Sequence, residues 1–317
     1  MDPARDLGGD APSHPVVTIG VFDGVHRGHQ KIIEQARWRA RSEGRPLLAV
    51  TFDPIPERVL RPEQAPPLLA TPHRRLELLA QCGIDAAYVV EFNRDFSALA
   101  PEEFVKTVLL DGLNASAVVV GRNFRFGHRA AGDVGFLARV AEAAGISVDV
   151  VDLLLLDIPP DDDPTPDSAR PRRITVSSSW IRDRIAVGAV AEAAVALGRP
   201  HRLEGVVIHG DHRGRELGFP TANIDVVPEL AIPADGVYAG RLSGMPAAIS
   251  VGANVTFGGA VRRVEAYVLD RADLDLYGSR VELDFVRRIR GMVDFGDAQT
   301  LRRHITEDVA RCREILT

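Results

Sequence analysis

The first half of the chain alternates short apolar runs with longer amphipathic segments. Apolar runs begin at Val16 and Leu47, and the segment between them predicts a helix over about 28–43. The same order continues with helices near 72–81, from Pro101 and near 134–144, and with strands at 86–92, 115–121 and 146–156. Continuous apolar strands separated by helices indicate an α/β fold with a parallel sheet, which binds ligands at the carboxyl ends of its strands.

After Pro200 the pattern changes to short alternating runs broken by glycine, which predict antiparallel strands. In the last stretch five apolar side chains recur at helical spacing, at Leu301, Ile305, Val309, Cys312 and Leu316. They predict a C-terminal helix that covers one side of a β-barrel or sheet.

The two patterns are joined by an acidic, proline-rich stretch over 157–173, which predicts a solvated loop. A short helix is predicted from Ser178, and an alanine-rich helix ends at Gly198. We place the domain boundary near Gly188, so that the predicted domains are 1–188 and 189–317.

Composition narrows the possible partners and the compartment. A chain of 317 residues suggests two domains, and 38 basic against 44 acidic residues give a net charge of −6. Small molecules are therefore expected as partners, rather than nucleic acid or a membrane. The two cysteines are far apart, and neither a signal peptide nor a membrane span is evident, so we expect a cytoplasmic protein without disulfides or thiolate-bound metal.

The basic residues include only two lysines, Lys31 and Lys106, and neither lies in a GxxxxGK[ST] loop. Any phosphate must therefore be bound by arginine, histidine, backbone N–H groups or a metal.

The first loop of the α/β half, GVFDGVHRGHQ, places His26 and His29 around Gly28, where a helix begins. Both rings can face one ligand, and the start of a helix attracts anions. Phosphate binding, metal ligation and surface histidines at a helix cap all fit this loop. The spacing of Gly20, Gly24 and Gly28 excludes a dinucleotide fingerprint.

Three weaker clusters lie in the same half. They are Pro54 and Pro56 after the second strand, Asn123 after the fourth, and Ser177–Ser179 with Arg182 at a helix start. The prolines could line a planar ligand or only make a turn, and the serines could simply cap a helix next to a solvated arginine.

The second half contains a more specific run, GDHRGRELGFPTANI. Thr221 and Asn223 alternate on one face of an extended segment, as a pair of metal or phosphate ligands should, although a glycine-rich β-turn is an alternative. Glu265 lies within an apolar strand, where it either points inward with a partner or a task, or faces solvent by alternation.

Taken together, these motifs resemble the bacterial bifunctional riboflavin kinase and FAD synthetase family over nearly the whole chain. His26, Gly28 and His29 fall on its H-x-G-H motif, and Ser177 to Arg182 fall on its S-S-T-x-I-R signature. The run GFPTAN reproduces its PTAN motif, followed by the glutamate at Glu265.

The sequence departs from the family at a few positions. Ser179 replaces a threonine and keeps the hydroxyl, and Ile55 replaces the histidine of F-D-P-H-P. Ala253 and Val255 stand where threonine and proline are usual. None of these is a principal catalytic group.

The resemblance implies a Rossmann-like nucleotidylyltransferase domain joined to a six-stranded antiparallel flavokinase barrel. It implies a transferase that phosphorylates riboflavin with ATP to FMN and then adenylylates FMN to FAD, with release of pyrophosphate. A chain that retains only one activity and a non-catalytic flavin-binding protein remain alternatives. The implied substrates and products are ATP, riboflavin, FMN and FAD, with Mg²⁺ as cofactor.

The resemblance also assigns roles. Glu265 is the base of the kinase step, and Thr221 and Asn223 bind Mg²⁺ and ATP phosphates. His26, His29 and Arg182 stabilise charge in adenylyl transfer. The remaining implied nucleotide contacts are Gly24, Gly28, Ser178, Ser179, Gly210 and Arg215, and the implied flavin contacts are Pro54, Pro56 and Asn123.

Overall fold

The computed structural model describes residues 13–159, 172–209, 218–256, 259–271, 275–293 and 297–317. Contacts divide the chain into two compact units, each described by itself. Unit 1 is Met1–Pro66 with Pro72–Leu155, and unit 2 is Pro67–Thr71 with Leu156–Thr317. The division at residue 188 concerns activity and stays a prediction. Gly210, Arg215 and most of the acidic loop lie outside the described residues.

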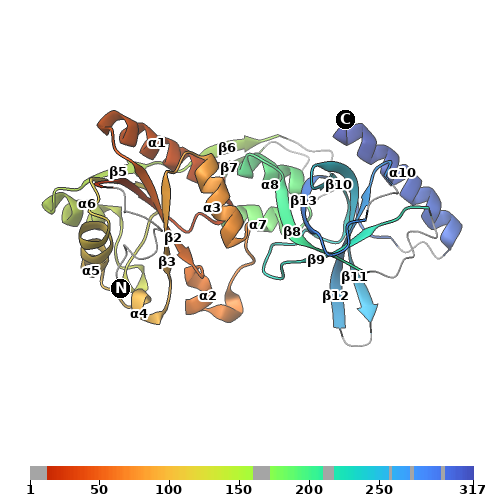
Figure 1. Cartoon of the computed structure of the whole chain (residues 1–317), viewed down its shortest axis with the longest axis horizontal. Helices are drawn as coiled ribbons and strands as arrows, with labels where there is room; N and C mark the ends of the chain where they lie inside the picture. Colours follow the sequence, from red (N-terminus) through yellow and green to blue (C-terminus); the bar gives the residue numbers. More distant parts are fainter. Residues whose placement is uncertain (1–12, 160–171, 210–217, 257–258, 272–274, 294–296) are drawn as a thin grey trace. The chain divides into compact units, whose positions relative to one another are not determined.

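Unit 1 contains a five-stranded parallel sheet in the order β3-β2-β1-β4-β5, which confirms the predicted α/β architecture (Figure 1). Every residue of the central strands β1 and β4 is buried, as expected for a sheet covered on both faces. The strands are β1 (Val16–Ile19), β2 (Leu47–Asp53), β3 (Ala86–Glu91), β4 (Ala117–Gly121) and β5 (Ser147–Val151).

The helices of unit 1 begin at caps that the sequence provides. His26 caps α1 and Asp133 caps α6, each accepting a hydrogen bond from a backbone N–H. The longer helices are α1 (Arg27–Glu43), α3 (Pro72–Gln81) and α6 (Val134–Ala143). The helix α5 (Pro101–Phe104) opens at Pro101, as predicted, and continues with π-type hydrogen bonding as η4 (Val105–Gly112). The shorter helices are α2 (Pro56–Leu60), α4 (Arg94–Ser97), η2 (Asp23–Val25), η3 (Pro62–Gln64) and η5 (His128–Ala130).

The strand predicted over 146–156 is divided. β5 ends at Val151, and β6 (Leu155–Ile158) pairs with β7 (Arg172–Thr175) in a separate two-stranded sheet. Asp152 lies at the break, where its carboxylate contacts Arg122 and its carbonyl accepts a hydrogen bond from Lys31 Nζ at 2.9 Å. These polar contacts lie where the chain leaves the five-stranded sheet.

Unit 2 is built on a closed antiparallel barrel in the order β10-β11-β12-β9-β8-β13, which confirms the second fold (Figure 1). Closure leaves no sheet edge unpaired. The helix α10 packs on the barrel through buried Val309, Cys312 and Leu316 and partly buried Ile305, which are four of the five residues predicted at helical spacing. The elements are α7 (Ser178–Ala186), α8 (Val190–Leu197), β8 (His201–Ile208), β9 (Ala222–Val226), β10 (Gly236–Leu242), β11 (Met245–Thr256), β12 (Gly259–Val268), β13 (Arg280–Arg290) and α10 (Ala298–Leu316).

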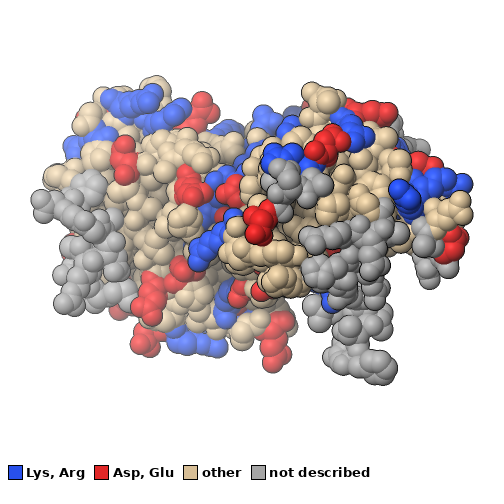
Figure 2. Space-filling view, turned by 45° about the vertical axis from the view of Figure 1, so that its right-hand side comes forward, with Lys and Arg blue, Asp and Glu red and all other residues tan. Residues whose placement is uncertain are grey.

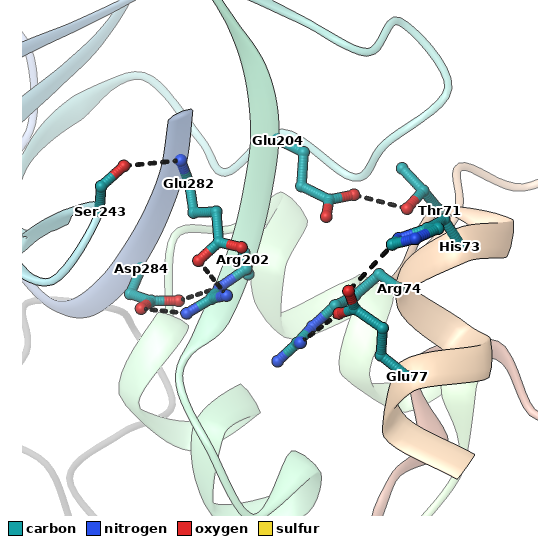
Figure 3. A network of polar contacts seen from close by, with 9 residues as sticks. All are labelled: Thr71, His73, Arg74, Glu77, Arg202, Glu204, Ser243, Glu282 and Asp284. Carbon is teal, nitrogen blue, oxygen red and sulfur yellow. Dashed lines mark hydrogen bonds and ion pairs between the residues drawn. The ribbon is translucent and has the colours of Figure 1, made fainter. Parts of the chain in front are cut away.

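An arginine joins β8 to β13 on the barrel surface (Figure 3). Arg202 donates from Nε and Nη2 to the two carboxylate oxygens of Asp284, each at 2.7 Å, and it also contacts Glu282. Nearby, Thr71 Oγ1 donates to Glu204 on β8. Asp284 on β13 lies directly opposite Arg202 on β8, so this bidentate pair stabilises the register between the two strands.

His201, at the start of β8, generates a prediction about stability. Its ring is 1% exposed, and Nε2 donates to the carbonyl of Ala231 at 2.7 Å. Burial lowers its pKa from 6.5 to about 4. The unfolded state binds a proton at His201 more readily than the folded state does. The contribution of His201 to the free energy of unfolding is therefore fully present above about pH 6.5 and is lost as the pH falls toward 4.

We expect the wild-type chain to lose about 2 kcal/mol of unfolding free energy from this group between pH 7.5 and pH 5. His201→Gln lacks the titration and should show a loss smaller by that amount. Urea unfolding followed by circular dichroism at the two pH values measures the difference. Equal pH dependence in both proteins would contradict the assignment.

Candidate functional site

The strand order of unit 1 places its candidate site at one edge of the sheet. β1 pairs with β2 on one side and with β4 on the other, so the order reverses between β1 and β4. Loops after such a pair diverge and leave a crevice at the carboxyl ends of the strands. The predicted residues follow these ends, with the histidine loop after β1, Pro54 and Pro56 after β2, and Asn123 after β4.

The loop after β1 has a tightly constrained backbone. Phe22, Gly24 and Val25 all have positive φ, at 52°, 75° and 39°. Glycine adopts this conformation readily, but for phenylalanine and β-branched valine it is strained. Phe22 and Val25 are buried, at 0% and 1% exposed, so packing holds the strained turn. The turn places His26 at the N-cap of α1.

His26 and His29, which the sequence analysis expected to face one ligand, lie against each other. Their rings stack with centroids 3.6 Å apart and an interplanar angle of 15°. The Nδ1 atom of His26 accepts a hydrogen bond from the backbone N–H of His29 at 3.3 Å. A neutral His26 ring therefore carries its proton on Nε2, where it is available as a donor.

The environment of His29 favours a neutral ring. Burial and the neighbouring His26 both hold the pKa of His29 well below 6.5. Phe22 contacts the ring edge to face at 5.2 Å, and Nδ1 of His29 is buried without a hydrogen-bond partner. At neutral pH this group offers a hydrogen bond to a ligand without carrying charge.

Asn123 and the two prolines lie in the segments that follow β4 and β2, at the same edge of the sheet. A Cβ atom on Gly121 would lie 3.3 Å from Oδ1 of Asn123, so the amide lies close over a residue that has no side chain. Pro56 occupies the first turn of α2, and Ile55, at the departure from the family motif, is 3% exposed.

The sequence analysis missed an aromatic cluster at this edge. Phe52 is the last residue but one of β2 and contacts Phe92 and Phe96 at centroid distances of 5.8 and 6.1 Å. The contacts continue through Phe104 to Phe126, which stacks on Phe124 at 5.4 Å. Phenylalanines at or just after the ends of three apolar runs were the available signal. The cluster is part of the hydrophobic core of unit 1, in which Phe52, Phe104 and Phe126 are buried and Phe92, Phe96 and Phe124 are partly buried.

Ser177–Arg182 belong to unit 2 and are described within it. Ser177 caps α7 by accepting a hydrogen bond from the N–H of Trp180 at 3.2 Å, so the predicted helix start is confirmed. Ser178 and Ser179 form the first turn. Arg182 Nε donates to the carbonyl of Pro67 at 2.7 Å, so this side chain is more than a solvated arginine.

The barrel brings together the polar residues predicted in the second half. Asn223 on β9 lies directly opposite Glu265 on β12, and Thr221 Oγ1 donates to Glu265 Oε2 at 3.1 Å. The neighbours of Glu265 along the strand, Val264 and Ala266, are each 1% exposed. Because side chains alternate, Glu265 points away from these buried neighbours and is half-buried beside a partner.

Ser250 completes this row and was missed by the sequence analysis. It lies opposite Glu265 on β11, between the fully buried Ile249 and Val251. The signal was a serine alternating with apolar residues. Nearby, Phe219 of the GFPTAN run contacts Tyr267 edge to face at 5.4 Å, which anchors the segment that carries Thr221.

The oxygen donors of this row suit Mg²⁺ only together with further ligands. Thr221 and Asn223 offer a hydroxyl and an amide, whereas Mg²⁺ requires six oxygen ligands. Within the described ranges, no group of three or more His, Cys, Asp or Glu side chains could hold a metal ion. The residues therefore fit a metal that arrives with phosphate oxygens.

Comparisons with known proteins agree with this geometry. The FAD synthetase family model matches residues 10–158, and the riboflavin kinase family model matches residues 197–316. Curated relatives described as bifunctional riboflavin kinase/FMN adenylyltransferase include proteins from Escherichia coli K12, Pseudomonas fluorescens and Listeria monocytogenes. They are 31%, 33% and 35% identical, over 94%, 99% and 92% of this chain and 92%, 98% and 90% of their own lengths.

A solved structure shares the fold of both units. It is described as a macrolide-efflux protein from Streptococcus pneumoniae, is 31% identical, and aligns with a TM-score of 0.84 over 99% of this chain and 97% of its own. In the part of this chain that the structure describes, no helix has the length and apolar character of a membrane span. The two family models and the relatives that match nearly the whole chain show that this chain belongs to the bifunctional riboflavin kinase/FMN adenylyltransferase family.

Proposed function

We propose that this chain is a transferase that makes FAD in two steps, with riboflavin phosphorylation in residues 189–317 and FMN adenylylation in residues 1–188. The observation that carries the proposal is the hydrogen bond from Thr221 to Glu265 beside Asn223. It joins a carboxylate base to a hydroxyl, and Asn223 lies opposite that carboxylate, on the outer face of a barrel whose sequence matches the riboflavin kinase family.

In the kinase step, Glu265 accepts the proton of the terminal ribityl hydroxyl as its oxygen attacks the γ-phosphorus of ATP. The new oxygen–phosphorus bond forms as the bond to the β-phosphate oxygen breaks, giving FMN and ADP. Thr221 and Asn223 hold Mg²⁺ and the phosphates. The metal supplies positive charge for the transferring phosphoryl group. Gly210 and Arg215 complete the proposed nucleotide contacts.

In the second step, a phosphate oxygen of FMN attacks the α-phosphorus of a second ATP, and pyrophosphate leaves. His26 and His29 donate hydrogen bonds to the phosphate oxygens, and Arg182 supplies charge. Gly24, Gly28, Ser178 and Ser179 let the backbone and hydroxyl groups approach the nucleotide. Pro54, Pro56 and Asn123 contact the flavin beside the phenylalanine cluster.

Charge and thiol chemistry support small-molecule partners in the cytoplasm. On the face shown in Figure 2, basic and acidic side chains are interspersed, unlike the basic stripe that favours nucleic acid. Both cysteines are free thiols, which suits a reducing compartment.

Glu265→Gln tests the kinase base. The amide keeps an acceptor for Thr221 but cannot take a proton, so FMN formation should fall by about 100-fold or more. Conversion of supplied FMN to FAD should stay at the wild-type rate. Both are measured by chromatography of flavins. Glu282→Gln, a barrel carboxylate paired with Arg202, serves as the control and should leave both rates near wild type; an unimpaired Glu265→Gln kinase would refute the role.

His29→Ala tests the phosphate contact in the other half. Loss of one donor to the developing charge should lower kcat for FAD formation by about 100-fold, with riboflavin phosphorylation unchanged. His73→Ala removes an exposed histidine of the same unit and should have no effect. Normal FAD output from His29→Ala would exclude this histidine from the site.

Metal removal tests the proposed role of Mg²⁺. EDTA should stop both transfers, and added Mg²⁺ should restore them. Calorimetric titration of the chain with Mg²⁺ should show saturable binding only when nucleotide is present, because Thr221 and Asn223 by themselves offer too few ligands. Undiminished FMN formation in EDTA would contradict the metal assignment.

A further inference from the structure

A buried arginine contacts the chain just after β1 and near the end of β2, at the sheet edge that carries the candidate adenylyl-transfer residues. It belongs to none of the motifs found in the sequence analysis. Arg75 is on α3 and is 3% exposed, on the same buried face as Leu78 and Leu79. Helical spacing would place an apolar residue there. A buried guanidinium is costly unless it is paired, so its contacts indicate its task.

Arg75 bonds to both of the loops that carry the predicted site residues. Its Nη1 donates to the carbonyl of Val21 at 3.2 Å, and its Nη2 donates to the carbonyl of Phe52 at 2.8 Å. Val21 follows β1 and leads into the strained turn before His26. Phe52 lies at the end of β2 and leads into Pro54.

The charges around Arg75 are divided between the same loops. Nη2 is 4.0 Å from Oδ1 of Asp53, which precedes Pro54. Burial lowers the pKa of Arg75, and the charges of Asp53 and of buried Asp23 oppose this shift. Asp23 is in the turn before His26. One cation therefore binds a carbonyl of each loop and is attracted to a nearby carboxylate of each.

We propose that Arg75 is a positioning residue for adenylyl transfer, which sets the spacing between the His26–His29 loop and the Pro54–Pro56 loop. This inference rests on the proposed function, in which the first loop contacts ATP phosphates and the second contacts the flavin. Arg75 touches neither substrate. It holds the two loops so that the FMN phosphate meets the α-phosphorus, a step in which small misplacements are costly.

The test uses Arg75→Met and Arg75→Lys in the full chain, with FMN and ATP concentrations varied in the FAD-forming reaction. Arg75→Met should raise KM for FMN by about tenfold or more and also lower kcat, because both loops lose their spacing. Riboflavin phosphorylation by the same preparation should be unchanged. Arg75→Lys should restore KM only in part, since an ammonium lacks the planar fork that spans two carbonyls.

Leu79→Ala is the matched control. It removes a side chain that is 1% exposed on the same helix face and that donates no hydrogen bond to either loop carbonyl. We expect it to lower Tm. A purely structural loss reduces the folded fraction, so it lowers the apparent kcat and leaves KM unchanged. Leu79→Ala should behave in this way.

Two results would overturn the inference. One is an unchanged KM for FMN and ATP in Arg75→Met, with only a lower Tm as in Leu79→Ala. The other is full recovery in Arg75→Lys, which would show that charge alone suffices. If Arg75→Met does not fold, the KM of Arg75→Lys decides the matter, and an unchanged value there overturns the proposal. Failure of the wild-type chain to make FAD from FMN would instead refute the proposed function.

Discussion

A parallel sheet leaves carbonyl groups without strand partners where the chain turns away, and buried carbonyls require hydrogen bonds. In unit 1 this constraint shapes the edge at which the site forms. The carbonyl of Val21 accepts hydrogen bonds from Arg75 and from Thr51 Oγ1, at 3.2 and 3.0 Å, and the carbonyl of Phe52 accepts from Arg75. The residues that satisfy the strand ends thus also hold the loops that carry the predicted site residues.

The barrel of unit 2 meets the same requirement in another way. Closure pairs its strands, so the backbone needs no side-chain donors at a sheet edge. Polar side chains can then gather on the outer face wherever alternation keeps their neighbours buried. Ser250, Glu265 and Asn223 form such a row across three adjacent strands, and Phe219 anchors Thr221 beside it.

Neither unit has a GxxxxGK[ST] loop in which a lysine could bind phosphate. Lys31 donates to the carbonyl of Asp152, and Lys106 pairs with Asp111, so both ammonium groups have structural contacts. Unit 1 instead presents stacked imidazoles at the start of a helix, and burial keeps His29 neutral. Unit 2 presents a hydroxyl, an amide and a carboxylate. Hydrogen-bonding groups of this kind act through geometry, which explains why rigid turns and strands carry them.

The alternation of apolar and polar residues was enough to predict the parallel sheet, the antiparallel half and the C-terminal helix, because periodicity reflects local burial. The motifs also placed His26 at a helix start and Thr221 beside an extended segment. Tertiary structure alone decided which side of β12 Glu265 occupies, since alternation defines two faces without saying which one packs inside. It also revealed Arg75, because an arginine within an amphipathic helix normally indicates a solvated face, and only the strand ends that meet it explain its burial.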